Sequence, residues 1–238
     1  MMLETLHVKI FADGADLAGM REMHKLPYIK GFTTNPTLMR KAGVSDYRQF
    51  AREVLAEIRD RPISFEVLSD DFAEMERQAH EIAAWGPNVY VKIPVTNSQG
   101  VPAYDLAHRL SHAGVRINMT AALTLEQVAC AAEALSGGAP ADVSVFAGRI
   151  ADTARDPVPI MAAAVQLLAA RAPNVELIWA SPRELLNIFQ ADAIGCHIIT
   201  VTNDVLKKLS LVGKDLTEYS LETVRMFARD GQAAGFTL

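Results

Sequence analysis

Residues 63–94, ISFEVLSDDFAEMERQAHEIAAWGPNVYVKIP, hold two apolar runs separated by a stretch with helical periodicity. The runs Ile63–Val67 and Val89–Ile93 have the length and composition of buried strands. Between them, Asp71–Trp85 carries apolar residues at spacings of three and four, which indicates an amphipathic helix. A strand, a helix and a second strand in this order predict a parallel pair joined by a crossover helix.

The same alternation continues along the whole chain. Eight short apolar runs are expected to be strands: His7–Ala12, Gly31–Thr34, Ile63–Val67, Val89–Ile93, Arg116–Met119, Asp142–Phe146, Glu176–Ala180 and His197–Val201. Helix starts are predicted from a capping box at Thr124 and Gln127, and from Ser45, Asp70 and Asn203 as further caps.

Eight such units without a Ser/Gly/Pro-rich linker predict one closed (β/α)8 barrel over residues 1–238. A doubly wound open sheet is the alternative, but Asp13-Gly14-Ala15-Asp16 lacks the Gly-rich turn that usually follows its first strand. We expect residues 203–238 to form the last helix and a helical tail. This tail is more than a barrel needs, and it could cover the barrel bottom or dock on a neighbouring subunit.

Composition restricts the possible functions. A net charge of -5 over 238 residues argues against a general nucleic-acid or membrane-surface binder, since both depend on a positive field. Cys130 and Cys196 lie in apolar segments and are expected to be reduced. Residues 1–4 show no secretory signal, and Ile160–Ala170 is too short to span a bilayer. We therefore expect a cytoplasmic protein with no nucleic-acid or membrane partner.

Lys92 interrupts the apolar run Val89–Pro94 and needs an explanation. Lysine side chains are almost never fully buried without a partner, and desolvation favours the neutral, nucleophilic amine. Lys92 is therefore a candidate Schiff-base nucleophile. The structural alternative is that its ammonium group extends past the strand end to a carboxylate or to solvent.

Polar residues stand at the expected C-terminal ends of the strands, where barrels carry their chemistry. They are Asp13, Thr33-Thr34-Asn35-Pro36, Glu66, Lys92, Asn118, Thr120, Ser144 through Arg149, and Ser181. Amine, carboxylates, amides and hydroxyls come together without a metal-ligand motif, so we expect neither a metal nor an organic cofactor. His108 and His112 are spaced as two metal ligands, but no third ligand lies nearby in sequence.

This set suits an enzyme that acts on a polyhydroxylated ketone. An imine at Lys92 would act as an electron sink, so that a carbon–carbon bond could break by a retro-aldol step. Asp13 could take the hydroxyl proton, and Glu66 could act through a water held by Thr120. Asn35, Asn118 and Ser144 would hold substrate hydroxyls.

Several ordered motifs resemble the transaldolase family, in its short branch that includes fructose-6-phosphate aldolase. The motifs are Phe11-Ala12-Asp13, Thr33-Thr34-Asn35-Pro36-Thr37, Val91-Lys92-Ile93-Pro94, Asn118-Met119-Thr120 and Gly148-Arg149-Ile150. The resemblance implies a (β/α)8 barrel with a Schiff base at Lys92, Asp13 as acid and base, and Glu66 with Thr120 around a catalytic water. It further implies phosphorylated sugar substrates of the pentose phosphate type and a homo-oligomer, pentameric or decameric.

The resemblance also implies a substrate site. Arg149, Ser181 and Arg183 would bind phosphate, with Ser181-Pro182 expected to start a helix. Thr34 and Phe146 complete the expected substrate contacts.

Glu66 and Phe146 match transaldolases, whereas the aldolases of this branch resemble one another in carrying Gln and Tyr at these positions. The leading interpretation is transfer of a dihydroxyacetone unit from a ketose phosphate, such as fructose 6-phosphate or sedoheptulose 7-phosphate, to an aldose phosphate. Alternatives are release of free dihydroxyacetone, a specialised transaldolase of a secondary sugar pathway, and a sugar-phosphate-binding barrel without turnover. Gly14, Pro182 and residues 97–102 depart from the family pattern and bear on the choice of acceptor.

Overall fold

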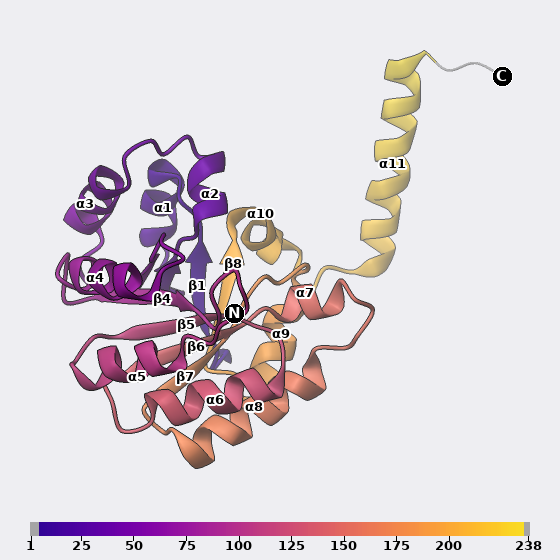
Figure 1. Cartoon of the computed structure of the whole chain (residues 1–238). Helices are drawn as coiled ribbons and strands as arrows, with labels where there is room; N and C mark the ends of the chain where they lie inside the picture. Colours follow the sequence, from indigo (N-terminus) through magenta and orange to yellow (C-terminus); the bar gives the residue numbers. More distant parts are fainter. Residues whose placement is uncertain (1–4, 236–238) are drawn as a thin grey trace. The chain divides into compact units, whose positions relative to one another are not determined.

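The computed structural model describes residues 5–235 and contains the expected barrel. Eight parallel strands close on one another in chain order, β1 to β8, with helices around them (Figure 1). The strands are β1 Lys9–Asp13, β2 Ile29–Thr33, β3 Ile63–Glu66, β4 Val89–Pro94, β5 Ile117–Ala122, β6 Ala141–Val145, β7 Val175–Trp179 and β8 Ile198–Thr202. The predicted (β/α)8 fold class is confirmed.

Ten helices belong to the described part of the barrel unit. They are α1 Leu17–His24, α2 Pro36–Lys41, α3 Tyr47–Glu57, α4 Phe72–Ala83, α5 Tyr104–His112, α6 Leu125–Leu135, α7 Ala147–Ala151, α8 Val158–Arg171, α9 Leu186–Ala193 and α10 Asn203–Leu206. Two of them, α2 and α3, follow β2 and separate it from β3 in sequence.

The helix caps correct two sequence predictions. The capping box at Thr124 and Gln127 is present at the start of α6. The caps of α3 and α4 are Asp46 and Asp71, each one residue after the predicted Ser45 and Asp70. Each aspartate accepts a backbone N–H three residues later, and this bond fixes the helix start.

Side chains inside the barrel close it below the strand ends. Phe11, Ile178, Ala180 and Ile198 form a buried apolar cluster, against which Phe146 packs. Gly31 on β2 is required beside Phe11, since a Cβ there would lie 2.5 Å from the phenyl Cζ. The interior is therefore a packed core, and the open space of the barrel lies at one end of it.

The chain divides into two compact units, the first ending at Leu206 and the second beginning at Lys207. The second unit holds a 3-10 helix, Lys207–Leu211, and the tail helix α11, Leu216–Ala234, which confirms the expected additional C-terminal helix. Within residues 5–235, no helix combines the length and apolarity needed to cross a bilayer.

Candidate active site

A cavity of about 730 Å³ opens at the C-terminal ends of the strands. It collects ten of the twelve side chains that the sequence predicted for the site: Asp13, Asn35, Glu66, Lys92, Thr120, Ser144, Phe146, Arg149, Ser181 and Arg183. Thr34 and Asn118 lie outside its lining. Parallel strands in a closed barrel end at the same face, which is why residues far apart in sequence meet here.

Lys92 lies inside the barrel and faces this cavity. It is 5% exposed, and its Nζ donates a hydrogen bond to the Thr34 carbonyl at 2.9 Å. The same nitrogen lies 3.5 Å from Oε2 of Glu66, whose side chain is 16% exposed. The ammonium group therefore has an acidic partner within the cavity, at the neighbouring strand end, and it is not directed to bulk solvent.

Asp13 is the second carboxylate of the cavity. Thr33 Oγ1 donates to its Oδ1 at 2.8 Å, and the Thr33 hydroxyl also contacts Thr200. Burial raises the pKa of Asp13, whereas the Lys92 charge and the Thr33 hydrogen bond act in the opposite direction. A carboxyl group with a raised pKa, close to a lysine, is suited to accept and return a proton.

The Thr120 hydroxyl is buried on the cavity wall. Within residues 5–235, its Oγ1 has no hydrogen-bond partner. A buried hydroxyl left in this way is costly unless a ligand or a water bonds to it. Thr120 can therefore offer its hydroxyl to a molecule that enters the cavity.

The side chains of Thr34 and Asn118 are hydrogen-bonded to Ser64 on β3. Thr34 Oγ1 donates to the Ser64 carbonyl at 2.9 Å. Asn118 Nδ2 donates to Ser64 Oγ at 3.0 Å, and its Oδ1 accepts from Ser144 Oγ at 2.7 Å. Neither side chain lines the cavity, but Asn118 is linked to the lining through Ser144.

Asn35 has a structural bond in addition to its place on the cavity wall. Its Oδ1 accepts from Leu38 N at 3.0 Å and caps α2, which begins at Pro36. Because the cap uses only the oxygen, the Nδ2 amide remains available as a donor to a substrate hydroxyl.

Two arginines lie at the other side of the cavity. The Arg149 guanidinium stacks over the Phe146 ring at 5.4 Å. Arg183 forms an ion pair with Asp152, and both of these side chains are about half exposed. Arg183 is therefore already bonded to a carboxylate, whereas the contact described for Arg149 within residues 5–235 is with an aromatic ring.

The backbone at Ser181 differs from the sequence prediction. Ser181 has a φ of 60° and does not cap a helix, because α9 begins only at Leu186. A Cβ on Gly148 would lie 1.5 Å from the Ser181 carbonyl, so α7 approaches this turn more closely than any residue but glycine permits. The expected helix start at Ser181-Pro182 was therefore wrong, although Ser181 still lines the cavity.

The departures from the family pattern do not all reach the cavity. Pro182 lines it, but Gly14 and residues 97–102 do not. The 97–102 segment closes on itself through a bridge between Thr96 and Pro102, and Ser98 is bonded to Asp70. Only Pro182 therefore remains as a departure with direct access to a substrate in this cavity.

The cavity also contains residues that the sequence did not assign to it. Lys41 at the end of α2, and Thr200 and Thr202 on β8, are part of its lining. The two threonines occupy alternate positions on their strand, which is the pattern of inward-facing residues, and this signal could have identified them. Lys41 lies in a charged helix end with no comparable signal.

A polar cavity at the C-terminal strand ends of a closed eight-stranded barrel is the position of the active site in (β/α)8-barrel enzymes, and the chain is of this class. The family model for Transaldolase/Fructose-6-phosphate aldolase matches residues 10–238. The chain belongs to this family.

Two relatives agree with this assignment, and a solved structure shares the fold. A probable transaldolase of Dehalococcoides mccartyi is 37% identical over 202 residues, covering 85% of this chain and 90% of the relative. A probable transaldolase of Thermoanaerobacter sp. is 36% identical over 231 residues, covering 97% and 100%. A solved structure titled "Native KDPGal structure" shares the fold with a TM-score of 0.55 at 14% identity, covering 83% of this chain and 82% of the other.

Proposed function

We propose that the protein is a transaldolase that transfers a dihydroxyacetone unit from a ketose phosphate to an aldose phosphate through an imine at Lys92. The observation that carries this proposal is the position of Lys92 Nζ in the cavity, 3.5 Å from the Glu66 carboxylate. Fructose 6-phosphate and sedoheptulose 7-phosphate are the proposed donors. The same proposal includes a cytoplasmic location and a role in pentose phosphate interconversion.

In the first half-reaction, the neutral Lys92 amine adds to the C2 carbonyl of the donor, and loss of water leaves a protonated imine. Asp13 takes the proton of the C4 hydroxyl, the C3–C4 bond breaks, and its electron pair moves to the imine as an enamine. The shortened aldose phosphate leaves. The raised pKa of Asp13, which burial causes, makes its carboxylate a better proton acceptor for this step.

In the second half-reaction, the enamine carbon attacks the aldehyde of the acceptor and a new C3–C4 bond forms. Asp13 returns its proton to the resulting alkoxide. Glu66 then acts through a water bonded to Thr120, which adds to the imine and releases the new ketose from Lys92. The Asn35 amide donates to a sugar hydroxyl and the Ser144 hydroxyl oxygen accepts from one, while Arg149, Ser181 and Arg183 hold the phosphate.

Transfer is favoured over simple cleavage by Phe146, which lines the cavity without a hydroxyl group. A phenol at this position could help to protonate the enamine and release free dihydroxyacetone, whereas a phenyl ring cannot. The enamine is therefore expected to persist until an acceptor arrives.

The assay is incubation with fructose 6-phosphate, with and without erythrose 4-phosphate, followed by product analysis. We expect sedoheptulose 7-phosphate and glyceraldehyde 3-phosphate in equal amounts, and only when both substrates are present. Free dihydroxyacetone without an acceptor would support the aldolase alternative. Binding of fructose 6-phosphate without any product would support a sugar-phosphate-binding barrel and contradict the proposal.

We further propose that the chain forms a homo-oligomer, a pentamer or a decamer. In the unit formed by residues 207–235, Leu216 is 80% and Phe227 is 64% exposed on α11, and Tyr219, Val224 and Met226 extend the same apolar stripe. Apolar stripes of this kind usually mark a surface that another chain covers. Light scattering coupled to size-exclusion chromatography would report the mass, and a monomer would contradict this proposal.

A further inference from the structure

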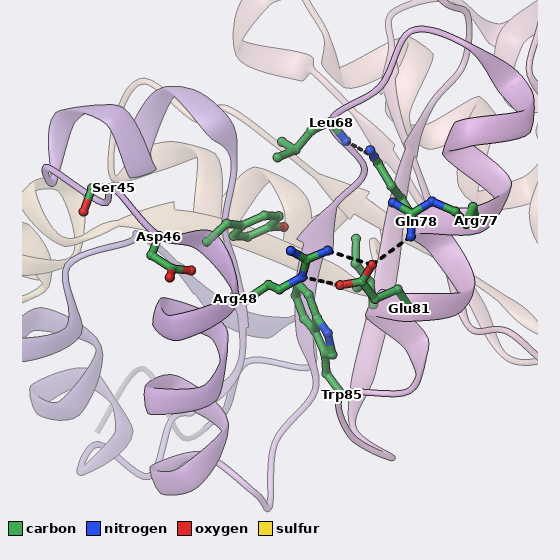
Figure 2. A pocket seen from close by; sticks show the side chains of 10 residues that line it. Ser45, Asp46, Arg48, Leu68, Arg77, Gln78, Glu81 and Trp85 are labelled. Carbon is green, nitrogen blue, oxygen red and sulfur yellow. Dashed lines mark hydrogen bonds and ion pairs between the residues drawn. The ribbon is translucent and has the colours of Figure 1, made fainter.

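A second pocket lies outside the barrel, between α3 and α4. Tyr47, Gln78 and Trp85 are among the residues that line it, and Figure 2 shows the Arg48–Glu81 ion pair within the lining. This pocket shares none of the residues that line the active-site cavity. Two of its side chains, Tyr47 and Gln78, nevertheless form hydrogen bonds with the segment that contains Glu66.

The Tyr47 hydroxyl forms two hydrogen bonds with the backbone of Glu66. It accepts from Glu66 N at 2.8 Å and donates to Glu66 O at 3.0 Å. The Tyr47 ring packs edge-on against Phe65 and Trp85, with centroids 6.2 and 5.5 Å away. Burial raises the pKa of Tyr47, so the phenol keeps the proton that it donates.

These bonds replace rungs of the sheet between β2 and β3. Thr34 N donates to the Ser64 carbonyl at 3.1 Å, and the next rung of a parallel ladder would join Glu66 N to the Thr34 carbonyl. The rung after that would need an N–H at residue 36, which is a proline and has none. The Tyr47 hydroxyl bonds to both the N–H and the carbonyl of Glu66, so the hydrogen-bond ladder between β2 and β3 ends here.

The Thr34 carbonyl is consequently available to another donor, and that donor is Lys92 Nζ at 2.9 Å. The Glu66 side chain, on the residue that Tyr47 holds, lies 3.5 Å from the same nitrogen. Tyr47 thus affects both groups that lie next to the Lys92 ammonium group. It bonds directly to the backbone of Glu66, and it leaves the Thr34 carbonyl free to accept from Lys92.

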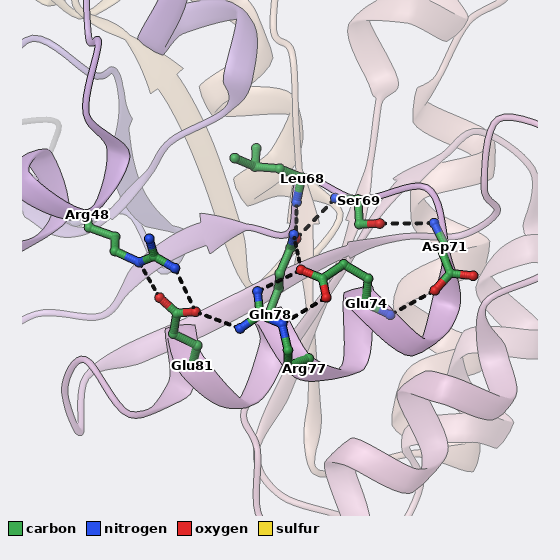
Figure 3. Close-up of polar contacts among 8 residues, drawn as sticks. All are labelled: Arg48, Leu68, Ser69, Asp71, Glu74, Arg77, Gln78 and Glu81. Carbon is green, nitrogen blue, oxygen red and sulfur yellow. Dashed lines mark hydrogen bonds and ion pairs between the residues drawn. The ribbon is translucent and has the colours of Figure 1, made fainter.

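The segment after Glu66 is fastened from the same side. Gln78 Oε1 accepts from Leu68 N at 2.7 Å and from Ser69 N at 3.1 Å, as Figure 3 shows. Glu74 in turn accepts from Gln78 Nε2 at 3.1 Å. Helices α3 and α4 therefore hold the end of β3 at two successive places.

We propose that Tyr47 is a positioning residue for the active site. Its hydroxyl ends the β2–β3 ladder, which places the Glu66 carboxylate beside Lys92 and leaves the Thr34 carbonyl to accept from the Lys92 ammonium group. The proposal rests on the proposed function, because only an enzyme that uses Lys92 and Glu66 needs them in this arrangement.

The test compares Y47F with the matched control Y90F. Each variant loses one hydroxyl from a tyrosine that is at least partly buried, but the charged groups near Tyr90 are Asp142, Arg116 and Glu176, not Glu66 or Lys92. For Y47F we expect kcat of dihydroxyacetone transfer to fall about tenfold or more with the KM for fructose 6-phosphate unchanged, because Glu66 is displaced and the phosphate site is not. Y90F should stay within about twofold of the original protein.

A second readout needs no sugar substrate. Reaction of the Lys92 amine with 2,4-pentanedione releases water and gives an enaminone, which ultraviolet absorbance detects. In Y47F the Glu66 N–H can turn to the Thr34 carbonyl, and Lys92, which faces the charges of Glu66 and Asp13, then loses an acceptor for its ammonium form. At one fixed pH, the rate of enaminone formation in Y47F should differ from that of the original protein by about twofold or more, and that of Y90F should not change.

Three results would overturn the proposal. One is a Y47F variant with the kcat and the rate of enaminone formation of the original protein. Another is a Y47F variant that circular dichroism shows to be unfolded under assay conditions, since the hydroxyl would then serve the fold as a whole. The third is an original protein that forms no imine at Lys92, which sinks the proposed function first and is thereby distinguished from a failure of Tyr47 alone.

Discussion

Nζ of Lys92 lies 3.5 Å from Oε2 of Glu66, and the two side chains are 7% and 16% exposed. Oppositely charged groups at this distance attract strongly when little solvent separates them. The carboxylate is close enough to exchange protons with the amine through a single water. This pair is the structural basis for the predictions that concern catalysis.

Replacement of Asp13 should separate imine formation from bond cleavage. In D13N the amide can still accept from Thr33, but it cannot take a hydroxyl proton. We expect cleavage of fructose 6-phosphate to slow by roughly 10²- to 10⁴-fold, while borohydride still traps an adduct at Lys92. The measurement is the rate of glyceraldehyde 3-phosphate release beside the adduct yield, and cleavage within tenfold of the original rate would show that Asp13 is not the base.

A hydroxyl added at residue 146 should change the product. F146Y would place a phenol on the cavity wall, where it can donate a proton to the enamine. We expect release of free dihydroxyacetone from fructose 6-phosphate to rise in the absence of an acceptor, and transfer to erythrose 4-phosphate to fall. An enzymatic assay of dihydroxyacetone measures the first effect, and no increase would count against the role given to Phe146.

Loss of the Arg149 guanidinium should weaken binding of phosphorylated donors. Arg149 lines the cavity and stacks on Phe146, whereas the matched control Arg155 lies outside the lining. Because a hydrogen bond to a charged group contributes about 1.5–3 kcal/mol, R149A should raise the KM for fructose 6-phosphate roughly 10- to 100-fold. R155A should leave it unchanged, and equal effects of the two variants would argue against a phosphate contact at Arg149.

A carboxyl group inside the barrel predicts a pH dependence of stability. Burial, followed by the charge of Glu176, raises the pKa of Asp142 well above its ordinary value, and Lys9 opposes this shift. The folded protein therefore binds the proton more tightly than the unfolded chain, so the free energy of unfolding falls as the pH rises from about 4 through the raised pKa. This is the opposite of the usual pattern for an ion-paired aspartate.

The variant D142N should remove this dependence. We expect D142N and the original protein to have similar unfolding free energies below about pH 4, and D142N to be the more stable of the two at neutral pH. Urea unfolding at a series of pH values measures both curves. Parallel curves across the series would contradict the account given for Asp142.

The sequence was sufficient to predict the barrel and most of its cavity lining. Strand periodicity is local, and in a closed parallel barrel it places the end of every strand at one face. Asp13, Glu66 and Lys92 could therefore be assigned to one site without knowledge of their contacts. The same argument could not separate Thr34 and Asn118, whose side chains bond to Ser64, from the residues that face the cavity.

Other features depend on contacts that local patterns do not contain. Tyr47 lies 19 residues before Glu66 and bonds to its backbone. Any residue at position 66 has the same backbone groups, so the residue type at this position does not indicate the contact. Ser181 has a left-handed backbone, and its carbonyl lies against Gly148, which belongs to another strand–helix unit. The Ser-Pro pair does not contain this contact and by itself suggests a helix cap. The caps at Asp46 and Asp71 were displaced by one residue because two neighbouring polar residues fit the capping pattern equally well.

The central claim is that Lys92 forms an imine with a ketose phosphate. The most direct measurement is incubation with fructose 6-phosphate and borohydride, followed by peptide mass mapping of the protein and of a K92M variant that circular dichroism shows to be folded. The account predicts one reduced adduct, on Lys92, and none in K92M. An adduct on another lysine, an adduct that persists in K92M, or no adduct in the original protein would contradict it.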